Sequence, residues 1–234
     1  MKKDNAKNLL KFIEASPSVF HVIKNMSDIL DKNDFTRLYE SNPWQLQEGK
    51  SYYTIRNDSS IIAFKIPKGG VNAFQIMASH SDSPSFKVKE NPEMEVEKHY
   101  IKLNVEKYGG MLMAPWFDRP LSLAGRAMIR ENGKIVTRLI NVDRDLVLIP
   151  NLAIHMNRQA NDGYAYNAQN DMLPLFGGIS AKGTYKTIIA KAAGVAEADV
   201  LSSEIFCYNR QSGTIWGADN EFISSPKLDD LECA

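Results

Sequence analysis

The stretch IMASHSDSPSFKV, residues 76–88, marks the place where the character of the chain changes. It begins with apolar residues, as a buried strand does, and continues into His80 and Asp82 before a Ser-Pro pair. On its N-terminal side, helical and strand patterns follow one another. On its C-terminal side, up to about residue 150, nearly all signals are those of strands. The stretch therefore predicts a boundary between an α/β part and a β-rich part.

The N-terminal side predicts two amphipathic helices and then strands. Residues 5–15 have a helical pattern, and Ser18 can cap a second helix, whose apolar residues recur at spacings of three and four. Residues 51–56 and 61–66 flank a polar turn, which is typical of a hairpin. Val71–Ser79 reads as a third strand, so that His80 would lie where this strand leaves its sheet.

The C-terminal side predicts a strand-rich segment, and α/β signals resume near the C-terminal end of the chain. We expect a helix over 184–193, closed by Gly194, and strands over 100–105, 121–129, 135–140, 145–149 and 204–208. Asn132-Gly133 is a strong hairpin turn. The fold class predicted is α/β, with residues 1–88 and 213–234 in one domain and residues 89–212 as a β-rich insertion.

Composition excludes several classes of protein. The 234 residues carry 28 basic and 28 acidic side chains, a formal net charge of zero, which argues against nucleic acid or an anionic membrane as the main partner. No apolar run approaches the ~20 residues of a membrane span. The N-terminal residues do not resemble a secretory signal, and the only two cysteines, Cys207 and Cys233, suggest reduced thiols. We therefore expect a cytoplasmic protein.

His80 and Asp82 are the first candidates for chemistry. On extended chain, His-x-Asp places both side chains on one face, so one ring nitrogen could bind a metal while the carboxylate holds the other N–H. The alternative is an ordinary turn at Asp82-Ser83-Pro84 with His80 at its edge. His-x-Asp alone does not decide between the two.

A second acidic site lies in SSPKLDDL, residues 224–231. Asp229 or Asp230 could bridge metal ions, or could be a carboxylate facing the dipole at the start of a helix. Of the other histidines, His21 reads as a partly buried helix residue and His99 as a surface residue. The sequence has no glycine-rich phosphate loop, no Gly-x-Ser-x-Gly elbow and no Cys-x-x-Cys pair, which removes support for nucleotide, serine-hydrolase and zinc-finger functions.

Five blocks in the same order carry a family resemblance. They are KFIEASPSVFHVI (11–23), ASHSDSPSFKVK (78–89), YGGMLMAPWFDRPLSLAGR (108–126), LIPNLAIHMNR (148–158) and EFISSPKLDDL (221–231). Together they resemble the M18 family of metallo-aminopeptidases, the aspartyl aminopeptidase family, from about residue 8 onward. The resemblance favours the ligand interpretation of His80 over the turn.

The resemblance implies a zinc-exopeptidase α/β sandwich interrupted by a β-rich dimerisation domain. It implies two zinc ions, peptide substrates that lose N-terminal residues, acidic ones in the best-known members, and dimers that assemble into a dodecamer. Position by position, it makes His80 a ligand of one zinc, Asp82 the residue that orients His80, and Asp229 the bridge between the metals. His155 matches a histidine that contacts substrate bound in a neighbouring subunit.

The sequence departs from the family after Asp229. The general-base glutamate, a metal-binding glutamate, a further aspartate and a closing histidine follow that aspartate in the family, whereas this chain has no histidine after His155. We therefore expect an N-terminal fragment of a longer aminopeptidase, its sandwich incomplete. The alternative is a non-catalytic dimerisation or assembly module derived from such an enzyme.

Overall fold

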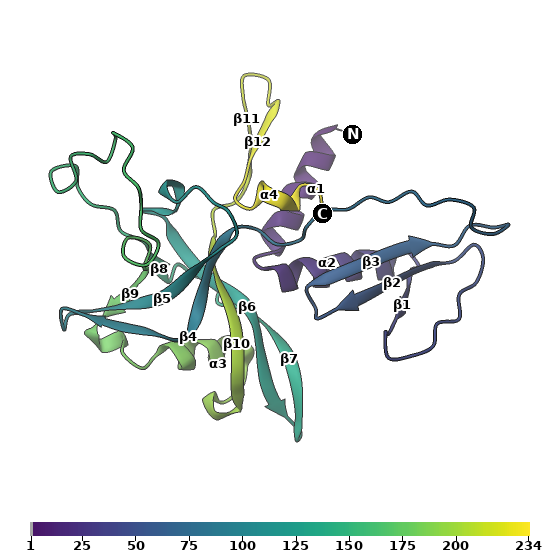
Figure 1. The fold of residues 1–234 in the computed structure, drawn as a ribbon, viewed down its shortest axis with the longest axis horizontal. Helices are drawn as coiled ribbons and strands as arrows, with labels where there is room; N and C mark the ends of the chain where they lie inside the picture. Colours follow the sequence, from purple (N-terminus) through teal and green to yellow (C-terminus); the bar gives the residue numbers. More distant parts are fainter. Residues whose placement is uncertain (1) are drawn as a thin grey trace. The chain divides into compact units, whose positions relative to one another are not determined.

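A computed structural model describes residues 2–234, which divide into two compact units. The residues up to Ser83 together with Gly213–Ala234 form the first unit, and Pro84–Ser212 form the second (Figure 1). The protein is thus a mixed α/β structure, whereas the peptidase and dimerisation roles of its two parts stay predictions. No helix among the described residues is both long and apolar enough to cross a membrane.

The first unit pairs two helices with a small sheet. The predicted helices are confirmed as α1 (Lys2–Ala15) and α2 (Val19–Lys32). The predicted hairpin is β2 (Ser51–Arg56) and β3 (Ser60–Lys65), and its turn contains left-handed backbone that Asn and Asp tolerate. A short strand that the sequence did not signal, β1 (Thr36–Leu38), pairs in parallel with β2.

The start of α2 differs in one detail from the prediction. Ser18 occupies the N-cap position in extended conformation, but its hydroxyl makes no capping hydrogen bond. Instead, Ser18 Oγ lies 2.8 Å from His21 Nδ1, and the prediction that His21 is a partly buried helix residue is confirmed. The hydroxyl therefore satisfies the histidine rather than a backbone N–H.

The prediction of a strand over Val71–Ser79 is wrong for this structure. The segment is irregular and forms no ladder with any described strand. Its apolar side chains are open to solvent, with Phe74 84% and Met77 92% exposed. A strand exists only through pairing, and the described residues supply no neighbour for this segment.

The C-terminal part of the first unit is a hairpin followed by one tight turn. The hairpin, β11 (Thr214–Trp216) and β12 (Phe222–Ser224), was not predicted. The turn, α4 (Leu228–Leu231), has non-helical dihedrals at Asp229 and Asp230. Asp229 therefore does not sit in the first turn of a regular helix, and the dipole explanation of its carboxylate loses its basis.

The second unit is built on a sheet that closes on itself. Six strands follow the order β10-β4-β5-β9-β8-β6, and β6 pairs back with β10, while β7 attaches outside to β6. The strands are β4 (Ser85–Val96), β5 (Tyr100–Tyr108), β6 (Pro120–Glu131), β7 (Lys134–Asn141), β8 (Val147–Leu148), β9 (Leu175–Gly178) and β10 (Val200–Asn209). Helix α3 (Tyr185–Ala193) and the 3-10 turns η1 (Ala114–Trp116), η2 (Ile179–Ala181) and η3 (Glu197–Asp199) complete it.

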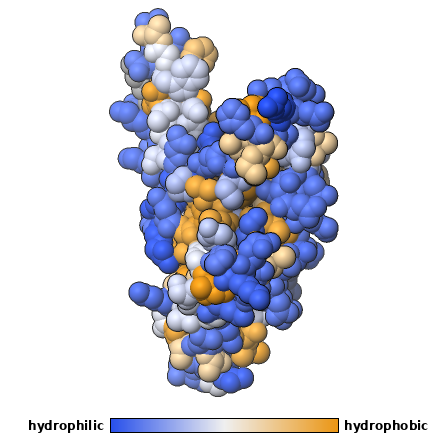
Figure 2. All heavy atoms as spheres, turned by 90° about the vertical axis from the view of Figure 1, so that its left-hand side faces the viewer, coloured by the Kyte–Doolittle hydropathy of each residue, from blue (hydrophilic) through white to orange (hydrophobic). Residues whose placement is uncertain are grey.

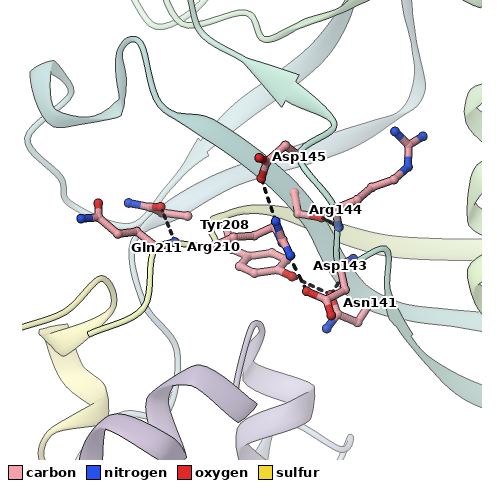
Figure 3. A network of polar contacts seen from close by, with 9 residues as sticks. Asn141, Asp143, Arg144, Asp145, Tyr208, Arg210 and Gln211 are labelled. Carbon is pink, nitrogen blue, oxygen red and sulfur yellow. Dashed lines mark hydrogen bonds and ion pairs between the residues drawn. The ribbon is translucent and has the colours of Figure 1, made fainter. Parts of the chain in front are cut away.

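Most predicted elements of this unit are confirmed. The Asn132-Gly133 turn joins β6 to β7 with positive φ at both residues, and Gly194 ends α3 in the left-handed conformation. The strand predicted over 145–149 is shorter, and β9 was missed. Asp145 instead binds Arg210 at 2.8 Å, next to an Arg210–Asp143 contact and a Tyr208–Asn141 hydrogen bond (Figure 3). This network fixes the end of β10.

Candidate metal centre

Two segments far apart in the sequence meet at His80. The first is the loop that follows the irregular segment, and the second is α4. The Asp230 amide points to the Asp82 carbonyl oxygen at 3.5 Å, and Ser81 Oγ donates to the Ser59 carbonyl. These backbone contacts hold the His80 loop between the β2–β3 turn and α4, all within the first unit.

The His80 ring faces a carboxylate with each nitrogen. Nδ1 lies 3.1 Å from Asp82 Oδ1 and 3.0 Å from the Asp82 carbonyl oxygen. Nε2 lies 3.6 Å from Asp229 Oδ1 and 3.7 Å from Asp230 Oδ2. A proton on Nδ1 satisfies Asp82 and leaves the Nε2 lone pair directed at the two carboxylates of α4.

This arrangement fits a metal ion by its spacing and donor types. Two ligand atoms that each bind tetrahedral zinc at about 2.0–2.2 Å stand roughly 3.3–3.6 Å apart. The separation of Nε2 from Asp229 Oδ1, 3.6 Å, lies at the upper end of that range. Imidazole nitrogen and carboxylate oxygen are both ligands that zinc accepts. His80 and Asp229 could therefore hold one ion between them.

The electrostatics of the cluster favour positive charge at His80. Desolvation is the largest single influence and lowers its pKa, but the hydrogen bonds to the backbone and side chain of Asp82 and the charge of Asp230 together outweigh it. The net result is a pKa of His80 raised above its ordinary value. A divalent cation benefits from the same carboxylates, so metal and proton compete for this nitrogen.

Asp230 contributes to the cluster together with Asp229. The sequence offers either aspartate as a metal bridge, and the family resemblance assigns the bridge to Asp229. The structure places Asp230 Oδ2 almost as near to His80 as the Asp229 oxygen. The peptide bond between these two aspartates is cis.

A second group of ligand-type atoms lies beside the first. One atom each from Asp230, Glu232 and Cys233 lies within 4.8 Å of the others. The pKa of the Cys233 thiol is raised, first by its hydrogen bond with Asp230 and then by desolvation and its acidic neighbours. A thiol must lose its proton to bind a metal, so this group is the weaker cation site of the two.

His155 and His80 belong to different compact units of the chain. His155 lies in an exposed turn of the second unit, where the Met156 amide donates to the Ala153 carbonyl. The two units are each compact, and the substrate-binding role of His155 stays a prediction. His99 is exposed, as expected, and its ring lies near that of Tyr100.

Comparisons with known proteins give one consistent result. Residues 12–234 match the family model described as Aminopeptidase I zinc metalloprotease (M18). A probable M18 family aminopeptidase 2 of Clostridium acetobutylicum is 44% identical over 97% of this chain, and one of Ectopseudomonas mendocina is 41% identical over 99%. The chain spans 54% and 56% of those two proteins, about half the length of each.

Solved structures of similar proteins share the fold. A chain of the Ape4 and Nbr1 complex superposes with a TM-score of 0.92 at 32% identity, over 98% of this chain and 48% of that one. Chaetomium thermophilum mApe1 gives 0.87 at 28% identity, over 96% and 55%. The mApe1 dodecamer of S. cerevisiae gives 0.80 at 25% identity, over 98% and 53%.

Proposed function

Because the chain belongs to the M18 family of zinc metalloproteases, we propose that its first unit supplies the His80–Asp82–Asp229 part of a zinc aminopeptidase site. The reaction would remove N-terminal residues from peptides. The observation that carries the proposal is the direction of the His80 ring. Its Nε2 faces Asp229 at 3.6 Å while Asp82 holds Nδ1.

Each of the three residues has a distinct task in this proposal. His80 would bind one zinc through Nε2, and Asp229, whose side chain is 71% exposed and free to present both oxygens, would bridge two. Asp82 would keep the proton on Nδ1 and fix the ring plane. Zinc bound here would acidify a coordinated water and polarise the peptide carbonyl.

The ligand count sets what this chain can do by itself. The cluster offers one imidazole and the carboxylates of Asp229 and Asp230, whereas a two-zinc site needs more ligands than these. Among the described residues, the ion-pair partners of His80 are aspartates, whereas the general base that the family resemblance implies is a glutamate. We therefore propose weak zinc binding and no turnover for the 234 residues alone.

The second unit is proposed as the dimerisation domain of the family. Its closed sheet contains a complete apolar core of its own, and hydrophobic side chains still remain exposed on it, Leu112, Leu152 and Met156 among them. Figure 2, which views the molecule from the side that carries the loops of this unit, shows hydrophobic side chains gathered amid hydrophilic ones. One solved relative is a dodecamer, which supports a homo-oligomer, and His155 would then reach the substrate of a neighbouring copy.

A second candidate function rests on the exposed hydrophobic side chains of the second unit. If the second unit is the functional part, the chain is a non-catalytic assembly module, and His80 and Asp229 bind no zinc. Both functions predict oligomers, so oligomeric state does not separate them. Zinc binding at His80 does.

The test is a zinc titration of the full chain followed by calorimetry. We expect binding that His80→Ala and Asp229→Asn each weaken by tenfold or more, because each variant removes one of few ligands. His99→Ala, which removes an exposed histidine of the second unit, is the matched control and should leave the affinity unchanged. An affinity that does not respond to His80→Ala would contradict the proposal.

A further inference from the structure

Lys227 reaches from the turn before Asp229 to the end of helix α1. Its Nζ donates hydrogen bonds to the carbonyl oxygens of Ile13 at 2.9 Å and Ser16 at 3.0 Å. The last carbonyls of a helix have no N–H partner within the helix, and a cation is favoured there by the helix dipole. Lys227 thus caps α1. It is distant from α1 in the sequence but stands two residues before Asp229, the candidate metal ligand.

The backbone at Lys227 is unusual for a residue with a side chain. Its φ of 62° and ψ of 24° lie in the left-handed region, which non-glycine residues enter at an energetic cost. Its side chain is held by the two hydrogen bonds to the end of α1. A strained backbone at a residue held in this way indicates that the contacts of the side chain fix the conformation.

The leucines that flank the two aspartates pack against α1 and α2. Leu231 is buried with Ile13 and Val22, and Leu228 packs against this cluster. Asp229 and Asp230 therefore lie between the packed Leu228 and the buried Leu231, while their carboxylates point toward His80. These contacts join the end of helix α1 to the turn that carries Asp229 and Asp230.

We propose that Lys227 is a positioning residue for the metal centre, which ties the Asp229–Asp230 turn to the C-terminal end of α1 and so aims Asp229 at His80. The inference rests on the proposed function, since it assigns Lys227 a role toward the same zinc ligands. Lys227 acts through the backbone of residues 227–231 and does not itself bind the metal.

The chain offers a matched control at the same helix end. Asn25 Nδ2 donates to the Ala15 carbonyl at 3.0 Å and to Ser16 Oγ at 2.9 Å. Asn25 comes from α2, so it caps α1 without any link to the Asp229 turn. Asn25→Ala and Lys227→Met should therefore both destabilise the end of α1, but only Lys227→Met should loosen the turn.

The experiment compares zinc affinity and amide hydrogen exchange in the full-length chain. Lys227→Met should weaken zinc binding about tenfold, the usual effect of losing a partner that supports a ligand. It should also speed exchange at residues 229–231. Asn25→Ala should change neither property, while its melting temperature falls. Lys227→Arg, which keeps a cation able to reach two carbonyls, should restore part of the affinity.

Three outcomes would overturn the inference. Unchanged zinc affinity and exchange in Lys227→Met would show that the turn is held by other contacts. Equal losses in Lys227→Met and Asn25→Ala would show a general effect of α1 stability. A wild-type chain that binds no zinc, or binds it equally well after His80→Ala, contradicts the proposed function first and removes the basis of this inference with it.

Discussion

At the scale of single residues, His80 uses its two ring nitrogens for different partners. Asp82 contacts Nδ1 with both a side-chain and a backbone oxygen, and the carboxylates of α4 face Nε2. Zinc can bind Nε2 only when that nitrogen carries no proton. The pKa of His80 is raised above its ordinary value of 6.5. Zinc affinity should therefore fall as the pH falls through this raised pKa, because His80 then takes up a proton.

Replacing Asp82 tests whether the two ring nitrogens of His80 have different partners. Asp82→Ala removes a hydrogen bond and a negative charge that raise the pKa of His80, so that pKa should fall. Zinc affinity at high pH should nevertheless drop about tenfold, because the ring loses its orientation. NMR titration of the imidazole gives the pKa, and the His99 resonance is the internal control. A His80 pKa that stays the same or rises would contradict this account.

His21 predicts a separate sensitivity to acid. Burial, and then the charge of Lys227, lower its pKa from 6.5 to about 4. The unfolded chain therefore binds a proton between pH 6.5 and about 4 that the folded chain rejects, and the free energy of unfolding falls as the pH falls through this window. The loss should amount to roughly 1–3 kcal/mol.

The measurement is urea unfolding of wild-type chain and His21→Gln at several pH values. The difference between their free energies of unfolding should shrink steadily from pH 6.5 to about 4, since only the wild type loses the His21 contribution. Above pH 6.5 the difference should be constant. Parallel curves across the whole range would mean that His21 takes up its proton in the folded chain as easily as in the unfolded one.

At the scale of elements, the sequence pattern predicted many of the helices, strands and turns that contacts between neighbouring residues stabilise. The helices α1, α2 and α3, the β2–β3 hairpin and the Asn132-Gly133 turn depend on neighbouring residues, and all are present. Several short elements were missed or misplaced. β9 and β1 are short strands that exist through pairing, while the Val71–Ser79 segment has a strand pattern without a partner.

The closed sheet depends on one close approach that the sequence did not signal. A Cβ built on Gly125 of β6 would lie 1.9 Å from the Glu204 carbonyl oxygen of β10. Gly125→Ala must therefore push apart the two strands that close the ring, and we expect a loss of roughly 2–3 kcal/mol. Gly110→Ala, where a Cβ meets nothing within 4 Å, is the control. Equal unfolding midpoints in urea for the two variants would be inconsistent with this packing.

The Val71–Ser79 segment should drive self-association. Its Phe74 and Met77 are 84% and 92% exposed on unpaired backbone, a combination that recruits other strands. Phe74→Lys combined with Met77→Lys should reduce light scattering at high protein concentration. Leu112→Lys, at a side chain 81% exposed in a loop, should reduce it less. A larger reduction of light scattering by Leu112→Lys would show that the second unit carries the self-associating surface.

At the scale of the whole molecule, the sequence predicted an α/β part, a β-rich part and a metal site that includes His80. Periodicity indicated the change near residue 88, because strands and helices differ in their repeat. The approach of His80 to α4 could not be read from periodicity, since it depends on Asp230 meeting the Asp82 backbone across the fold. Only the family resemblance linked His80 with Asp229. Lys227 gave no signal, because its role lies in a contact with α1.

Anomalous diffraction at the zinc edge from zinc-soaked crystals of the chain tests whether His80 and Asp229 share one zinc ion. We expect a peak about 2.0–2.2 Å from both His80 Nε2 and an Asp229 oxygen. A peak bound only by Asp230, Glu232 and Cys233, or one that lies elsewhere in the molecule, would contradict it.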